Sequence, residues 1–161
     1  MPGHTGGFGE PTCRHCHFDQ DLDDAAGGLT LEGMPATFTP GERYLLTVTV
    51  HHPQLVAGGF QMAARYAEGP ATGNNAGAFE ALGTRTRFSV HDTTGTRYVS
   101  HSRDGAHPPT PGRNTWQLMW QAPDTLTAPV VFHLAANAAN GDDSAFGDFI
   151  YLYNLRSSPR P

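Results

Sequence analysis

The chain of 161 residues contains no lysine, only two cysteines and no long apolar run. All ten basic residues are arginine, the formal net charge is −5, and no basic cluster occurs. A surface that tracks nucleic-acid phosphates is therefore not expected. No stretch approaches the roughly 18 apolar residues of a membrane-spanning helix. Because no basic segment followed by an apolar one opens the chain, we expect the signal peptide to be absent from this sequence.

Several catalytic motifs are also missing, namely a Gly-rich phosphate loop, a GxSxG elbow and an HExxH pair. Ser100, His101 and Asp104 are neighbours in the sequence, but proximity along the chain is poor evidence for a hydrolytic triad. These absences do not decide whether the protein is an enzyme.

The content of 19 glycines and 13 prolines, with few helical patterns, indicates short strands joined by turns. Apolar and polar residues alternate in "YLLTVTVHH" and "GGFQMAARY", as they do in half-buried strands. We expect loops at 67–82 and 102–114. The expected strands are 29–38, 44–52, 58–66, 84–92, 96–102, 115–123, 128–139 and 148–155. This spacing predicts an all-β, immunoglobulin-like two-sheet β-sandwich.

Residues 1–28 differ from the rest because they are rich in Gly, His and Asp and show no strand alternation. We expect three regions: an N-terminal extension at 1–28, a β-sandwich at 29–156 and a C-terminal tail at 157–161. The extension either packs on the sandwich or carries its own chemistry.

Residues 13–17 read Cys-Arg-His-Cys-His and fit CxxCH, the signature of covalent c-type haem attachment. The thiols of Cys13 and Cys16 are spaced to add to the two vinyl groups at one porphyrin edge, and His17 then reaches the iron as proximal ligand. We predict one covalent haem c in an N-terminal haem-binding extension. Since haem attachment requires an extracytoplasmic maturation system, the motif also predicts a periplasmic or cell-surface location.

Other uses of the cluster stay open. A zinc site needs four ligands, of which Cys13, Cys16 and His17 could supply three and His51 or His52 the fourth. A redox dithiol is expected at a helix start beside a βαβ pattern, and neither is evident. A disulfide between the two cysteines would close a very short loop and stabilise little.

Several segments together resemble the bacterial reelin-like (reeler) proteins, which are often described as choice-of-anchor domain proteins. They are "PGERY" at 40–44, "WQAP" at 120–123, "NAANGDDS" at 137–144, and the stretch 5–10 that precedes CxxCH. The resemblance implies an immunoglobulin-type sandwich that is secreted or tethered to the surface. It implies a C-terminal anchor in some relatives, so we expect membrane association only through an anchor missing here. It implies no known catalytic activity.

The sixth iron ligand decides the chemistry, since His or Met gives an electron carrier and an open position admits gas or peroxide. We predict His101, which ends a strand before a long loop; the proteins that this chain resembles also carry a histidine at the matching position. Met62 and Met119 are alternatives, although both are expected to fill the core. His133 is expected to be a satisfied core histidine, and His4 lies close enough in sequence to reach the haem.

Two acidic segments, 19–24 and 137–148, could supply oxygen ligands for calcium. Neither fits the EF-hand spacing, and solvated loops with Asx turns are the expected structure.

From these residues we expect an extracytoplasmic monohaem cytochrome that moves single electrons between redox protein partners. One alternative is a surface module that binds a glycan or a protein and holds a structural metal at the Cys/His cluster. Another is a haem protein that binds gas or peroxide.

Overall fold

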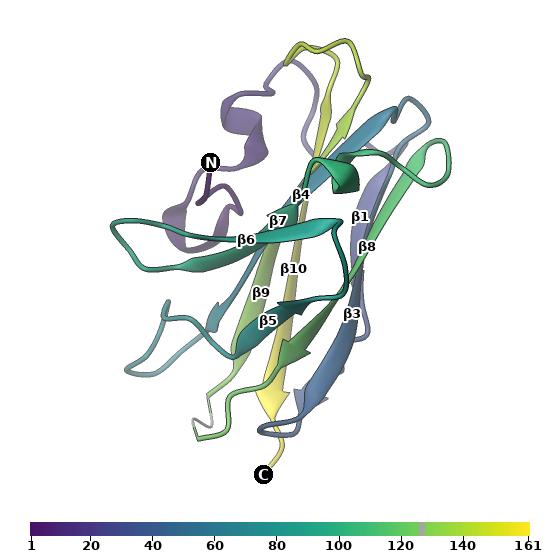
Figure 1. Cartoon of the computed structure of the whole chain (residues 1–161). Helices are drawn as coiled ribbons and strands as arrows, with labels where there is room; N and C mark the ends of the chain where they lie inside the picture. Colours follow the sequence, from purple (N-terminus) through teal and green to yellow (C-terminus); the bar gives the residue numbers. More distant parts are fainter. Residues whose placement is uncertain (126–127) are drawn as a thin grey trace.

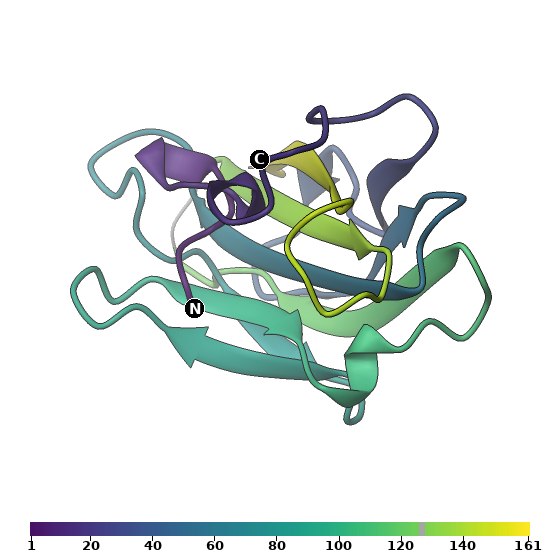
Figure 2. The same ribbon diagram turned by 90° about the horizontal axis from the view of Figure 1, so that it is seen from above.

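Alternating apolar residues place the strands of the computed structural model in two stacked sheets (Figures 1 and 2). The structure describes residues 1–125 and 128–161. Its elements in chain order are η1 (Gly7–Gly9), η2 (Cys13–His15), β1 (Gly28–Glu32), β2 (Thr37–Phe38), β3 (Arg43–His51), β4 (Ala57–Tyr66), β5 (Ala78–Ala81), β6 (Thr86–Val90), β7 (Arg97–His101), η3 (Asp104–Ala106), β8 (Arg113–Gln121), β9 (Val130–Ala139) and β10 (Phe149–Pro159).

One sheet has four strands in the order β1-β3-β8-β5, and the other has six in the order β2-β10-β9-β4-β7-β6. The paired strands are antiparallel, apart from the parallel pair of β2 and β10. The prediction of an all-β two-sheet sandwich is confirmed. None of the helices in the described ranges has the length and apolar character needed to cross a membrane.

The core between the sheets is built around the tryptophans of β8. Alternation along β8 buries Trp116, Leu118 and Trp120. The Trp120 ring packs edge-on against Phe38 and Phe132, with ring centroids 5.6 and 5.0 Å apart. Both indole N–H groups donate to backbone carbonyls, at 2.9 Å for Trp116 to Gly105 of η3 and 3.1 Å for Trp120 to Ala76. Burying these rings therefore leaves no indole donor unpaired.

Three boundaries differ from the sequence prediction. The expected strand 29–38 is interrupted at Gly33, whose φ of +92° favours glycine and where a Cβ would lie 2.0 Å from the Leu45 carbonyl oxygen. The expected loop 67–82 contains a strand, β5, which gains its hydrogen bonds from β8. The last strand continues to Pro159, inside the expected tail, because Ser158 pairs with Thr37 of β2.

The N-terminal segment, defined here as residues 1–27, packs on the outer face of the six-stranded sheet (Figures 1 and 2). Strand β4 shows this directly. Its Phe60 and Met62 are buried in the core between the sheets, as the alternation predicts. On the opposite face Gln61, Ala63 and Arg65 are also buried, with exposures of 8, 0 and 3%. The segment therefore covers a face that a sandwich would otherwise leave to solvent.

Arg65 fixes the N-terminal segment to the sheet. Its Nη1 donates to Glu10 Oε1 at 2.6 Å, and its Nη2 donates to Thr5 Oγ1 and the Gly7 carbonyl, both at 3.3 Å. The Phe8 ring lies over the guanidinium, 4.7 Å from Cζ. A buried guanidinium is stable only when it is paired in this way.

The hydrogen bonds of Arg65 to the N-terminal segment predict a large loss of stability on Glu10→Gln. The substitution leaves the Arg65 guanidinium buried without its anion, which we expect to cost about 3 kcal/mol in the free energy of unfolding measured with urea. The matched control is Glu68→Gln, which breaks an ion pair at the surface. In this pair Glu68 is 57% exposed and Arg156 is 52% exposed. That control should change stability by less than about 1 kcal/mol. Equal effects of the two substitutions would contradict this account.

The Glu10–Arg65 pair makes the stability of the protein depend on pH. Burial raises the pKa of Glu10, but hydrogen bonds from Thr5, Tyr98 and Arg65 outweigh it and bring the pKa below its ordinary value. The stabilisation is thus complete above the unfolded-state pKa of about 4.3 and is lost as the pH falls through the lower folded-state pKa. Urea titrations across this pH range should show that the free energy of unfolding falls more steeply with decreasing pH in the wild type than in Glu10→Gln.

Candidate functional site

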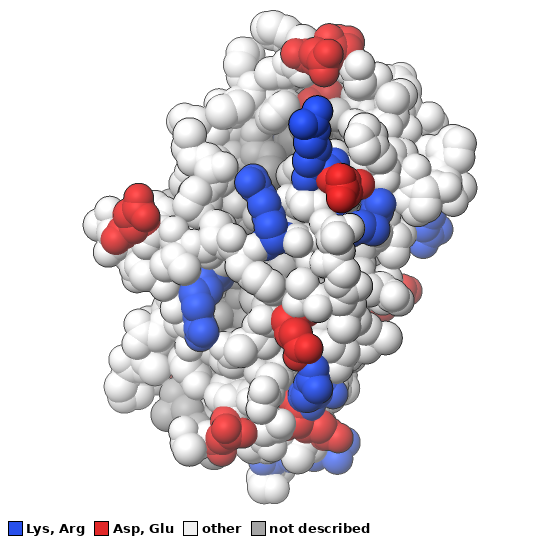
Figure 3. Space-filling view, in the orientation of Figure 1, with Lys and Arg blue, Asp and Glu red and all other residues white. Residues whose placement is uncertain are grey.

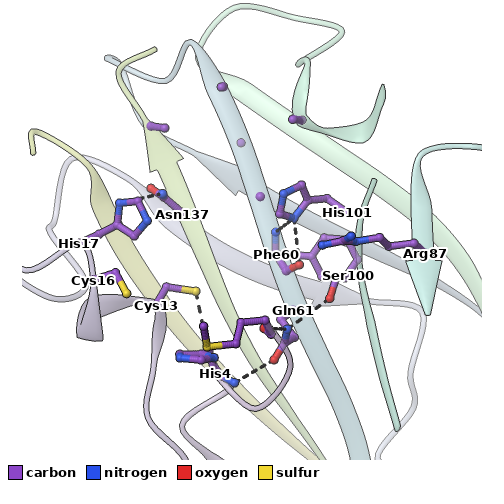
Figure 4. A pocket seen from close by; sticks show the side chains of 16 residues that line it. His4, Cys13, Cys16, His17, Phe60, Gln61, Arg87, Ser100, His101 and Asn137 are labelled. Atoms are coloured by element: carbon purple, nitrogen blue, oxygen red, sulfur yellow. Dashed lines mark hydrogen bonds between the residues drawn. The ribbon is translucent and has the colours of Figure 1, made fainter. Parts of the chain in front are cut away.

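A pocket of about 370 Å³ lies where the N-terminal segment meets the outer face of β4. Cys13, Cys16 and His17 line one part of its wall, and His101, at the end of β7, lines another (Figure 4). The structure thus brings to one pocket the four residues predicted from sequence to hold a cofactor.

The Cys-x-x-Cys-His stretch forms a tight turn. Thr12 begins η2, because its Oγ1 accepts a hydrogen bond from the Arg14 N–H at 3.2 Å. The backbone N–H groups of Cys16 and His17 then both donate to the Cys13 carbonyl, at 3.2 and 3.1 Å. The turn directs both thiols and the imidazole of His17 to the same pocket (Figure 4).

His17 is held by a buried carboxylate. Its Nδ1 lies 2.7 Å from Oδ2 of Asp148, a side chain that is 2% exposed. Asn137 Nδ2 donates to the same Oδ2 at 3.0 Å and lies 3.4 Å from His17 Nδ1. With Nδ1 engaged in this way, Nε2 is the nitrogen of His17 that is available to a ligand.

His101 lies across the pocket from His17 (Figure 4). Its Nδ1 is 3.1 Å from the Phe60 nitrogen and 3.2 Å from the Phe60 carbonyl oxygen, so the β4 backbone holds this nitrogen. Burial lowers the pKa of His101. The imidazole is therefore neutral at neutral pH, which is the form that binds metals.

Five small residues also line the pocket, namely Ala57, Gly58, Gly59, Ala106 and Ala139. Their small size leaves space for a flat apolar group. Gly59 is required for a further reason: a Cβ there would lie 2.6 Å from Cε1 of His101.

The residues present fit a covalent haem by the chemistry of their donors. Two free thiols and two imidazoles border a largely apolar pocket. Two further residues of the pocket wall, His4 and Asn137, each carry a buried polar atom, Nδ1 and Oδ1, that has no hydrogen-bond partner among the described residues. Unpaired buried polar atoms of this kind are rare in complete structures.

The Cys13 thiol does not have the properties of the reactive cysteine of a redox dithiol. Burial raises the pKa of the Cys13 thiol to about 11. Catalytic dithiols instead carry a cysteine with a lowered pKa, because the thiolate is the nucleophile.

The alternative zinc site is not formed. Within residues 1–125 and 128–161, no group of three or more His, Cys, Asp or Glu side chains is placed to hold a metal ion. His51 and His52, the expected completing ligands, do not line the pocket. His52 instead stacks on Phe149 at 3.8 Å, and its Nε2 lies 3.7 Å from Asp24 Oδ1.

The two acidic segments considered for calcium lie side by side, but their carboxylates accept hydrogen bonds from the backbone. Asp19 Oδ2 accepts from the Gly147 N–H at 2.7 Å, and Asp142 Oδ1 accepts from the Ser144 N–H at 2.9 Å. The contact of Asp142 with Ser144 is an Asx turn of the expected kind, whereas the contact of Asp19 with Gly147 joins the two segments.

The other candidate axial ligands lie away from the pocket, apart from His4. Met62 is fully buried between the sheets, as predicted. The expectation that Met119 fills the core is wrong, because Trp120 and its alternating neighbours take the inward side of β8. His133 is not a satisfied core histidine either. It lies on the outer face of β9 against Phe8, with ring centroids 5.3 Å apart, and its buried Nδ1 is unpaired among the described residues.

Asp148 and Asn137 belong to the site but had been considered only as calcium ligands. Alternation in β9 puts Asn137 on the outer face with His133, and this signal could have placed it near the extension. Asp148 precedes β10 and reaches His17 through the β9–β10 pairing, in which Phe149 faces Ala138. No spacing in the sequence predicts the contact between Asp148 and His17.

Comparison with solved structures supports the predicted fold. The Reelin-N domain of F-spondin matches with a TM-score of 0.59 and 20% identity, over 92% of this chain and 96% of that one. The reeler domain of human F-spondin (fragment 1) matches with a TM-score of 0.57 and 19% identity, over 87% and 92%. The chain has the sandwich fold of reeler domains.

A cohesin module from a Clostridium perfringens family 33 glycoside hydrolase also matches, with a TM-score of 0.51 and 10% identity, over 85% of this chain and 98% of that one. No protein-family model and no curated protein matches the chain. The similarity thus concerns the fold. The roles considered for the pocket residues depend on the distances and contacts described above.

The contact between Gly59 and His101 gives a prediction for the protein without cofactor. Gly59→Ala should displace the His101 ring, shift its NMR signals and lower the free energy of unfolding by about 1–3 kcal/mol, as overpacking does. Gly28→Ala is the matched control, because its Cβ would meet only the exposed ring of His51, at 3.0 Å. Unchanged His101 signals in Gly59→Ala would refute the contact.

Proposed function

We propose that this protein is an extracytoplasmic monohaem c-type cytochrome that transfers single electrons on a β-sandwich scaffold. The observation that carries the proposal is that the CxxCH turn and His101, which are far apart in the sequence, line one pocket. The location follows from the extracytoplasmic maturation that haem attachment requires.

Each side chain then has a defined role. Cys13 and Cys16 would hold the group through two thioether bonds, and His17 and His101 would offer the two imidazole ligands. A haem bound here would supply a one-electron couple between ferrous and ferric iron. Because iron held by two imidazoles is typical of an electron carrier, this pair of residues favours electron transfer over binding of gas or peroxide. Neither Met62 nor Met119 lines the pocket.

The charge around the pocket supports a redox protein as partner. Arginine side chains lie over β6, β7 and η3 on the face shown in Figure 3, with an acidic side chain among them. Among them Arg87 lines the pocket wall and is exposed, and it forms no ion pair with the described residues. The exposed positive charge of Arg87 beside the cofactor would attract an acidic group of a redox partner towards it.

The first test is maturation in a host that exports the chain and attaches haem c. We expect a red protein whose intact mass exceeds that of the polypeptide by one haem, with a covalent pyridine haemochrome. The control is the double variant Cys13→Ala, Cys16→Ala, which should be exported without covalent haem. A colourless wild-type protein with the mass of the polypeptide alone would refute the proposal.

The second test concerns the distal ligand. His101→Ala should convert the ferric iron from low-spin to high-spin in absorption and electron paramagnetic resonance spectra. His133→Ala, on the same sheet but outside the pocket, should leave the spectrum unchanged. A low-spin His101→Ala variant would exclude His101 and leave His4 as the next imidazole in the pocket wall. A high-spin wild type would instead favour gas or peroxide binding.

A second candidate function is a surface module that recognises a protein or glycan. It is favoured by Phe88 and Val90, apolar side chains on the edge strand β6 that are 50 and 55% exposed. This candidate requires no haem, so the maturation test separates it from the first.

A further inference from the structure

Asp148 is the most deeply buried carboxylate in contact with the pocket residues. Its side chain is 2% exposed and its Oδ2 lies 2.7 Å from His17 Nδ1. It also accepts hydrogen bonds from Asn137 Nδ2 on Oδ2, at 3.0 Å, and from the Asn140 N–H on Oδ1, at 3.2 Å. A carboxylate buried to this degree needs such donors to keep its charge.

The position of this charge matters for His17. A carboxylate that accepts the Nδ1 proton fixes the ring tautomer and orientation, and it raises the basicity of Nε2. Greater electron donation from a ligand stabilises the more highly charged ferric iron and lowers the reduction potential.

We propose that Asp148 is a positioning residue that holds His17 with Nε2 towards the pocket and lowers the reduction potential of the group bound there. This inference rests on the proposed function. It goes beyond it by assigning control of the potential to a residue that contacts neither the thiols nor the pocket interior.

Asn137 has the opposite effect to Asp148 on the negative charge that faces His17. Its amide donates to the same Oδ2 that accepts from His17, and so withdraws charge from the contact. Removing the amide should therefore act in the opposite direction to removing the carboxylate charge. A purely structural role of the two residues would give shifts of the same sign, because both variants would loosen the same contact.

The test is spectroelectrochemical titration of the matured holoprotein, with thermal unfolding measured in parallel. Asp148→Asn should raise the reduction potential and Asn137→Ala should lower it, relative to wild type. The control is Asp142→Asn, which removes one negative charge from the same loop at an exposed position. It should shift the potential much less than Asp148→Asn does.

The outcomes separate the inference from the proposed function. Absence of covalent haem in the wild type overturns the proposed function and the inference with it. Haem attached in all variants, with equal potentials or with shifts of one sign, overturns the inference alone. If Asp148→Asn does not mature, Asn137→Ala decides: a lower potential supports the role of Asp148, and an unchanged or higher potential refutes it.

Discussion

The buried guanidinium of Arg65 is the constraint on which the arrangement depends. It lies on the outer face of β4, 3% exposed, and its hydrogen bonds go to Thr5, Gly7 and Glu10 of the N-terminal segment. A charge buried in this way would be strongly destabilising without these partners. The segment is therefore part of the folded domain, and Cys13, three residues after Glu10, is fixed relative to the sheet.

The pocket exists because the N-terminal segment covers part of the outer face of the six-stranded sheet. The fold is that of reeler domains, whereas the candidate chemistry comes from a turn in the N-terminal segment and the end of β7. Function in such proteins resides in sites placed on a shared scaffold. Both imidazoles have their Nδ1 held by the protein, one by Asp148 and one by the Phe60 backbone. This is the preorganisation that a ligand site needs.

Strands with clear alternation, such as β3, β4 and β8, were predictable because their apolar side chains must face one core. Strand β5 was not, since Ala78–Ala81 carries little pattern of its own and becomes a strand by pairing with β8. Met119 was misplaced because tryptophans on both sides of it made the whole segment look buried. The end of β10 was missed because its last residues are ordered by β2, which lies far away in the sequence.

The sequence by itself determined the class of fold and the cysteine–histidine turn, since both depend on spacing within a few residues. It also singled out His101 as a second iron ligand beside His17, but not the pocket that holds the two. Only the tertiary structure decided that His101 faces His17, that Gly59 makes room for its ring, and that Asp148 holds the other imidazole. These contacts join strands and loops distant in the chain, and they form only when burial of the core brings the sheets and the N-terminal segment together.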